Sequence, residues 1–321
     1  MRWRKLGLIF DFETSDFAGE FVGYAQSPQA LVFKDRVRFY FSTRQRSENG
    51  KFVSIIQYIE MDKNFETILN RSHGTVIQLG KLGTFDEHGI FPFSVFRHNG
   101  EVWGYSNGWN RRKSVSVDTA IGLAISRDDG RTFQKIGDGP ILGPSLHEPF
   151  LVCDPFVRVF NREFHMWYIY GTGWRVASLG QDPERTYVIA HATSADGINW
   201  VREGRSIISQ THSDECQALP TVIQLDTRYH MLFCYRNTFD FRTNPANSYR
   251  IGYAWSDDLW NWTRDDASVG IMPTDGAWDS DMMCYPHLFT SNDKTYLAYN
   301  GNEFGRNGFG LAELESEDGN E

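Results

Sequence analysis

The sequence lacks several features that mark large classes of proteins. No apolar stretch approaches the roughly 18 residues of a membrane-spanning helix, and long runs of strong helix formers are nearly absent. Basic residues are outnumbered, because 32 Lys and Arg face 41 Asp and Glu, which gives a formal net charge of −9. These absences argue against a membrane partner, against a helical bundle and against a broad basic surface for nucleic acid.

Cysteine is also scarce. The four residues Cys153, Cys216, Cys234 and Cys284 show neither a CxxC pair nor the Cys/His spacing of a zinc site. We expect reduced, buried thiols rather than a disulfide framework. The N-terminal segment MRWRKLGLIF has an apolar run of only four residues, too short for a signal-peptide core. The sequence therefore predicts a cytoplasmic protein.

What the sequence has in abundance is aromatic residues and a long internal repeat. Phe, Tyr and Trp make up 15% of the chain, which favours strands. Five similar segments contain the prolines Pro28, Pro92, Pro155, Pro220 and Pro286, separated by 64, 63, 65 and 66 residues. Each segment reads as an apolar strand, a polar turn and a second strand rich in aromatics, and most are followed by a third strand and a turn such as SRDDGRTF.

Three to four strands in each of five repeats predict an all-β fold, a five-bladed β-propeller whose blades begin near residues 28, 92, 155, 220 and 286. The last repeat lacks its fourth strand, and the N-terminal RWRKLGLIF resembles the fourth strands of other repeats. We expect residues 2–10 to complete the last blade and to close the ring. The chain shows no linker, so residues 1–321 are predicted to form one domain.

Acidic residues precede the prolines and are predicted to gather around the central funnel. Glu87, Glu215 and Asp281 share the fifth position before the proline, and Asp154 stands directly before Pro155. A single acid of this kind serves equally well as a turn cap or as the ion-pair partner of an arginine. The acids taken together indicate a site that cleaves glycosidic bonds, because this chemistry uses paired carboxylates.

The ends of the second strands add side chains that suit a sugar ligand. Rings stack on the apolar faces of sugars, and amides and guanidiniums bind hydroxyls. The predicted substrate-binding residues are Trp109, Trp174, Arg175, Arg236, Asn237, Asp281, His287 and Arg44.

The blade number, turns such as SDDLWNW and hairpins such as YHMLFCY make the chain resemble the five-bladed propeller glycosidases of the arabinanase, levansucrase and invertase group, which includes glycoside hydrolase families 32, 43, 62 and 68. The resemblance implies three acids. CDPFV matches the transition-state stabiliser at Asp154, DECQALP matches the general acid at Glu215, and the order of blades puts the nucleophile or base at Asp86 or Glu87. Cys153 and Gln217 replace the family's usual Arg and Pro in these motifs.

We therefore expect a carbohydrate-active enzyme, a glycoside hydrolase that cleaves or transfers a glycosyl unit. The altered motifs keep a second hypothesis open, a non-catalytic sugar-binding propeller or an accessory module in glycan assembly. The expected partner is a small carbohydrate or glycoside, and Arg236, Arg242 and Arg250 leave open whether it is anionic. No cofactor is expected, with calcium near a channel histidine such as His287 as the alternative.

Overall fold

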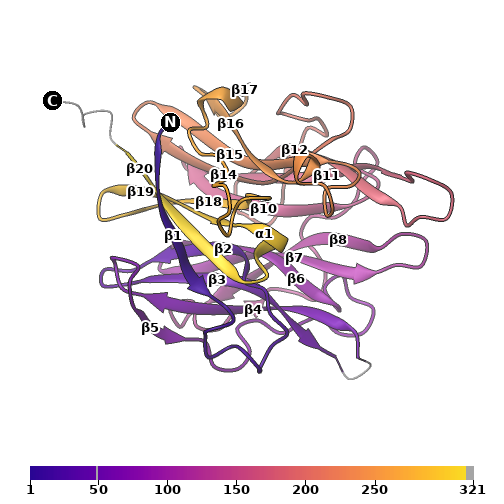
Figure 1. The fold of residues 1–321 in the computed structure, drawn as a ribbon. Coiled ribbons are helices and arrows are strands. Elements are labelled where there is room, and N and C mark those ends of the chain that lie inside the picture. Colours follow the sequence, from indigo (N-terminus) through magenta and orange to yellow (C-terminus); the bar gives the residue numbers. More distant parts are fainter. Residues whose placement is uncertain (48–49, 316–321) are drawn as a thin grey trace.

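The computed structural model describes residues 1–47 and 50–315 and consists almost entirely of β structure (Figure 1). The strands are β1 (Trp3–Asp11), β2 (Gln26–Val32), β3 (Val37–Arg46), β4 (Phe52–Met61), β5 (Ile68–Arg71), β6 (Gly89–His98), β7 (Glu101–Arg111), β8 (Val117–Ser126), β9 (Gln134–Lys135), β10 (Val152–Phe160), β11 (Glu163–Arg175), β12 (Glu184–Ser194), β13 (Val201–Arg202), β14 (Glu215–Leu225), β15 (Arg228–Asn237), β16 (Arg250–Ser256), β17 (Thr263–Arg264), β18 (Cys284–Ser291), β19 (Lys294–Asn300) and β20 (Gly308–Leu314). Short helical turns are η1 (Pro245–Asn247), η2 (Asp266–Ser268) and α1 (Asn302–Gly305). The predicted all-β fold class is confirmed. Within these described ranges, no helix is long and apolar enough to span a bilayer.

The strands pair in sets of four that follow one another along the chain. Set I is β2–β5, set II is β6–β9, set III is β10–β13 and set IV is β14–β17, and neighbouring strands within each set are antiparallel. Sets I and II touch through one parallel pair, Ser54 with Gly89. We interpret each set as a propeller blade. The count of five blades and the single domain over residues 1–321 stay predictions.

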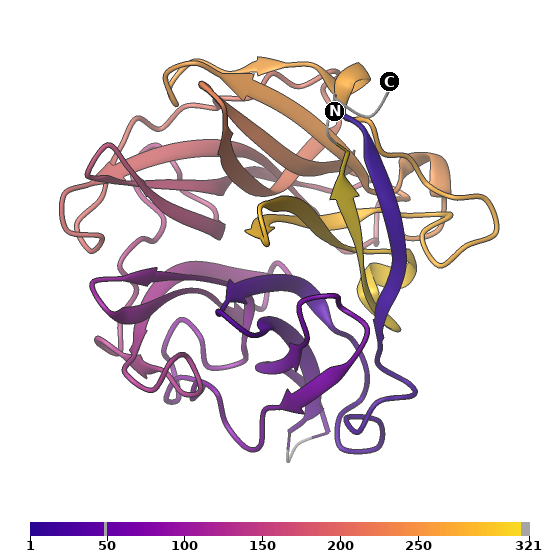
Figure 2. The same ribbon diagram turned by 90° about the vertical axis from the view of Figure 1, so that its left-hand side faces the viewer.

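The last set, set V, combines the two ends of the chain. Its inner strands are β18, β19 and β20, and β1 pairs antiparallel with β20 from Trp3 opposite Leu314 to Asp11 opposite Gly308. Figures 1 and 2 show the indigo β1 running alongside the yellow β20. The N-terminal strand thus occupies the outer position that the fold prediction gives it, and it covers an edge that would otherwise be open.

Aromatic side chains at the turn after each third strand pack against the preceding set. Phe133 of set II lies 5.8 Å from Tyr40, Trp200 of set III lies 6.0 Å from Tyr105, and Trp262 of set IV lies 6.2 Å from Trp167, all between ring centroids with edge-to-face geometry. This geometry is favourable for aromatic pairs. The repeated aromatic residue therefore joins neighbouring sets.

An ion pair recurs in every set between an acid before or at the start of the first strand and a base on the fourth strand. The pairs are Glu20 with Arg71, Asp86 with Lys135, Glu148 with Arg202, Glu215 with Arg264 and Asp279 with Lys5. The last four acids are buried. Each pair ties the inner segment of a set to its outer strand, so these acids have a structural role in the fold.

Candidate functional site

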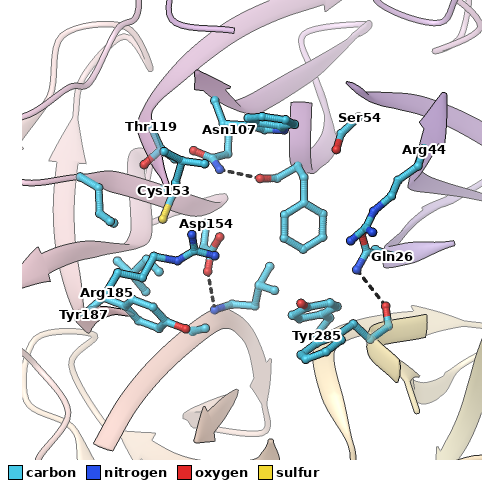
Figure 3. Close-up of a pocket in the computed structure, with 18 of the residues that line it drawn as sticks. Gln26, Arg44, Ser54, Asn107, Thr119, Cys153, Asp154, Arg185, Tyr187 and Tyr285 are labelled. Carbon is cyan, nitrogen blue, oxygen red and sulfur yellow. Dashed lines mark hydrogen bonds between the residues drawn. The ribbon is translucent and has the colours of Figure 1, made fainter. Parts of the chain in front are cut away.

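A pocket of about 640 Å³ opens at the end of the sets where their first strands begin (Figure 3). All five sets contribute residues to it. The first strand of each set is interrupted by a bulge next to the repeated proline, and a bulge re-aims the side chains beside it. The residue before that proline has a positive φ in four sets, namely Ser27, Asp154, Leu219 and Tyr285, and the Phe91–Pro92 bond is cis. Four of these five pre-proline side chains line the pocket: Phe91, Asp154, Leu219 and Tyr285.

Asp154 is the polar member of this apolar floor. The Phe91 and Tyr285 rings, whose centroids lie 5.2 Å apart, line the same pocket, and Asp154 Oδ2 accepts a hydrogen bond of 3.2 Å from the Leu219 backbone N–H. Asp154 as a residue is 6% exposed. The positive φ of Asp154 recurs at the same position in three other sets, so it is a feature of the repeat. Among the described pre-proline residues, only the one in set III is an acid.

The surroundings of Asp154 favour its neutral form. Burial raises the pKa of Asp154 to about 7, and the Leu219 N–H, the Arg185 charge and Cys153 oppose this rise only in part. A carboxyl group with such a pKa carries a proton for much of the time near neutral pH. It is therefore able to act as a general acid.

The rest of the pocket wall is rich in positive charge. Its basic side chains are Arg44, Lys51, Arg111, Arg185, Arg236 and Arg242. Arg236 is 2% exposed, and its guanidinium donates to the Tyr187 hydroxyl at 3.0 Å and to the backbone carbonyls of Asn237 and Thr238. Asp154 is the sole carboxylate among the described residues that line this pocket.

The other acids predicted to be catalytic do not line the pocket. Glu215 is 1% exposed and lies 2.6 Å from Arg264, and it also accepts hydrogen bonds from Thr211 and Gln217. Burial raises the pKa of Glu215, but these hydrogen bonds outweigh that effect and lower the pKa below its ordinary value. Asp86 is buried against Lys135, and Glu87 accepts a hydrogen bond from the Gly83 N–H. The catalytic roles predicted for Glu215, Asp86 and Glu87 stay predictions, and the geometry gives each of them a structural partner.

The predicted substrate-binding residues divide between the pocket and other places. Trp109, Arg44 and Arg236 line the pocket. Trp174 packs against the hydrophobic core, and Arg175 forms an ion pair with Asp214.

The remaining three predicted residues lie apart from the main pocket. Asn237 lines a smaller pocket of about 290 Å³ together with Asp214 and Phe239. Asp281 is exposed. His287 is fully buried, with the rings of Phe156 and Phe289 each 6.1 Å away.

The channel around His287 does not suit calcium. Calcium takes oxygen ligands, whereas His287 lies between aromatic rings, and burial holds its pKa well below the usual range. Over the residues that the structure describes, no group of three or more His, Cys, Asp or Glu side chains could hold a metal ion. The expectation of no cofactor stays a prediction.

Several pocket residues escape the sequence prediction. Arg185 and Tyr187 begin β12, and Arg185 lies opposite Trp174 in the β11–β12 ladder. In an antiparallel hairpin the third strand begins where the second strand ends, so both lie at the pocket end of the set. The hairpin pattern in the sequence could have revealed this. Phe91, Leu219 and Tyr285 occupy the same position of the repeat as Asp154, so an alignment of the five repeats would also have found them.

Comparison with known proteins gives a family and a fold. An uncharacterized protein of Mycobacterium tuberculosis strain H37Rv is 32% identical over 322 residues, which covers 98% of this chain and 100% of that protein. This chain belongs to the family of that mycobacterial protein. No model of a known protein family matches the sequence. A shorter match, 29% identical over 137 residues, covers 40% of this chain and 43% of a β-1,2-mannobiose phosphorylase of Thermoanaerobacter sp. strain X514.

Solved structures confirm the resemblance to propeller glycosidases at the level of the fold. A glycoside hydrolase matches with a TM-score of 0.71 at 17% identity, covering 97% of this chain and 91% of that chain. A thermostable family-43 glycoside hydrolase matches with a TM-score of 0.65 at 14% identity, covering 93% and 92%. An exo-1,5-α-L-arabinanase from a bovine ruminal metagenomic library matches with a TM-score of 0.64 at 11% identity, covering 92% and 94%.

Proposed function

We propose that this protein is a carbohydrate-active enzyme that cleaves or transfers a glycosyl unit in the pocket, with Asp154 as the general acid. The observation that carries the proposal is the buried Asp154 carboxyl group, whose pKa of about 7 keeps a transferable proton at the pocket floor. Breaking a glycosidic bond requires proton donation to the leaving oxygen. Asp154 is the described pocket residue that meets this requirement.

The shape and lining of the pocket suit a small sugar ligand. A volume of about 640 Å³ lies within the range of small-molecule sites. Trp109 and Tyr285 offer ring faces, and Gln26 and Asn107 offer amide groups. Glycoside hydrolases among the proteins of the same fold, and the partial match to a mannobiose phosphorylase, support this substrate class. A short oligosaccharide or glycoside in the cytoplasm remains the expected substrate.

The non-catalytic sugar-binding propeller stays the second candidate. The observation that favours it is that Glu215, the acid expected from the resemblance, is held by Arg264 outside the pocket. A pocket with one carboxylate could bind a sugar without cleaving it. The two candidates differ in turnover and agree in binding.

A turnover assay with a matched variant separates the two candidates. Aryl glycosides and disaccharides are incubated with the wild type and with Asp154→Asn, and released sugar and ligand binding are both measured. The enzyme proposal predicts turnover that falls by about 10²- to 10⁴-fold in Asp154→Asn, while sugar binding is retained. Binding without turnover in the wild type would establish the second candidate, and neither binding nor turnover would refute both.

A further inference from the structure

Among the described residues that line the pocket, arginines outnumber carboxylates. In the described part of the chain, Arg242 is the one pocket arginine with a carboxylate partner, Glu184. Arg111 donates to the Phe52 carbonyl, and Arg236 donates to hydroxyl and carbonyl groups. Elsewhere arginines such as Arg202 and Arg264 are paired with buried acids. The contrast is sharp because the protein as a whole has a net charge of −9.

Two of the pocket guanidiniums, those of Arg44 and Arg185, have no hydrogen bond or ion pair to any residue that the structure describes. Figure 3 places them on opposite sides of the pocket, with Arg185 beside Asp154 and Arg44 across from it. The Tyr24 ring lies 3.8 Å from the Arg44 guanidinium and holds it, but a ring carries no net charge. Both side chains are half-buried, and positive charge held partly away from water without a counter-ion is unfavourable. The pocket therefore favours an anionic ligand.

The number of carboxylates decides which anion fits the chemistry. Hydrolysis of a glycoside uses two carboxylates, one to protonate the leaving oxygen and one to activate water or to attack. Among its described lining residues this pocket offers Asp154 alone. A second reactant that already carries negative charge needs no base. A carboxylated sugar would neutralise the arginines but would leave water without a base.

We propose that the pocket binds inorganic phosphate as the second substrate, so that the reaction is phosphorolysis of a glycosidic bond. This inference rests on the proposed function of the same site. Asp154 gives its proton to the glycosidic oxygen as the bond between that oxygen and the anomeric carbon breaks. An oxygen of hydrogen phosphate forms the new bond to the anomeric carbon. The glycosyl phosphate then releases its proton to solvent, and Asp154 takes up a proton from solvent. The products are a glycosyl phosphate and a free sugar.

Arg44 is the residue assigned to the phosphate. A nucleophile that displaces the leaving group in line approaches from the side opposite the acid, and Arg44 lies across the pocket from Asp154. A guanidinium holds phosphate by two parallel hydrogen bonds, which glutamine cannot reproduce. Arg185 lies on the acid's own side, where its charge lowers the pKa of Asp154 and opposes the effect of burial.

The reverse reaction provides the test, because it needs only a panel of sugar 1-phosphates with acceptor sugars and an assay for released inorganic phosphate. We expect phosphate release with one of these donors, and ³¹P NMR of the forward reaction should show a glycosyl phosphate. Arg44→Gln should raise the KM for phosphate about 10- to 100-fold. Arg228→Gln is the control, since this exposed arginine pairs with Asp257 at the far end of β15 and should leave the KM unchanged.

The outcomes distinguish this inference from the proposed function. Glycoside cleavage by water at a rate that phosphate does not change would overturn phosphorolysis and leave the glycosidase proposal intact. A larger rise in KM for Arg185→Gln than for Arg44→Gln would overturn the in-line placement of phosphate. Binding of inorganic phosphate is measured directly by calorimetry, so a variant that folds but loses turnover still reports on the anion site. No cleavage with either water or phosphate would refute the proposed function itself.

Discussion

At the scale of single residues, two acids of similar appearance in the sequence have opposite environments. Asp154 is buried on an apolar floor with one backbone donor, and its pKa is raised to about 7. Glu215 is buried as deeply, but Arg264, Thr211 and Gln217 donate to it, and its pKa is lowered. Burial alone therefore does not identify an acid catalyst. The partners of the buried group decide whether it keeps its proton.

Replacing Asp154 by Asn should stabilise the protein in a pH-dependent way. The folded-state pKa of about 7 lies above the ordinary aspartate value of 3.8. Between these values the folded state keeps a proton that the unfolded chain releases, so the wild type loses stability as pH rises through this window. Asp154→Asn should match the wild type near pH 4 and exceed it at pH 8 by up to about 4 kcal/mol. Thermal unfolding at both pH values measures the difference, and an equal difference at both would contradict the raised pKa.

At the scale of elements, each strand set joins its inner and outer ends by an ion pair, and in four of the five sets the side chain before the repeated proline lines the pocket. Glu148 also accepts a hydrogen bond of 2.7 Å from Tyr168, and Asp279 one of 2.9 Å from Tyr299. The same loop thus contributes a structural acid and, a few residues later, a pocket residue. The structural acid lies several residues before the repeated proline, whereas the pocket residue lies directly before it.

Breaking the pair in set IV should lower stability without removing activity. Arg264→Met leaves Glu215 buried without its cation, and the expected cost is about 3–5 kcal/mol. Glu215 has a lowered pKa, so its contribution is present above its unfolded pKa and is lost as pH falls through the folded pKa. Chemical denaturation measures both effects. Arg228→Gln, at an exposed pair, should cost less than about 1 kcal/mol.

The companion variant Glu215→Gln tests the role that the sequence gives to this residue. With a structural Glu215, turnover per folded molecule should be retained while the melting temperature falls. Loss of turnover at an unchanged melting temperature would instead support a catalytic Glu215. The assay is the glycoside panel used for Asp154→Asn, so the two acids can be compared directly.

At the scale of the whole molecule, the closing strand β1 joins the two ends of the chain. Phe10 is 1% exposed and lies 5.3 Å from Phe41 of set I and 5.4 Å from Phe309 of set V, between ring centroids. Trp3 donates through Nε1 to the Val269 carbonyl at 3.0 Å, which ties β1 to the segment after set IV. One strand therefore contacts set I, set V and the segment that follows set IV.

Removal of β1 should therefore weaken the whole protein. A chain without residues 1–11 should lose its cooperative unfolding transition, because it exposes the edge of β20 and leaves Asp279 without Lys5. Adding the missing segment as a peptide should restore part of the transition. Phe10→Ala should cost about 3–5 kcal/mol, while Arg4→Ala on the exposed face serves as the control. An unchanged transition after the deletion would show that closure by β1 is dispensable.

The sequence by itself determined the architecture, because the architecture depends on local patterns that recur. The sequence itself shows the prolines at intervals of 63 to 66 residues, the aromatic residue after most third strands and the missing fourth strand of the last repeat. Strand pairing and the contacts of Phe133, Trp200 and Trp262 follow from these patterns. The sequence also placed Asp154 at a pocket, since its position before Pro155 is fixed by the repeat.

Only the tertiary structure decided which acids face the pocket and which are paired. Glu215 is neutralised by Arg264, 49 residues away, and Asp279 by Lys5 at the other end of the chain. Such a pairing depends on side chains that meet only when each set closes, so no local pattern reports it. Arg44 and Arg185 have no ion-pair partner among the residues that the structure describes, and this too depends on the tertiary structure, because a charge is balanced only by the groups that surround it in the folded protein.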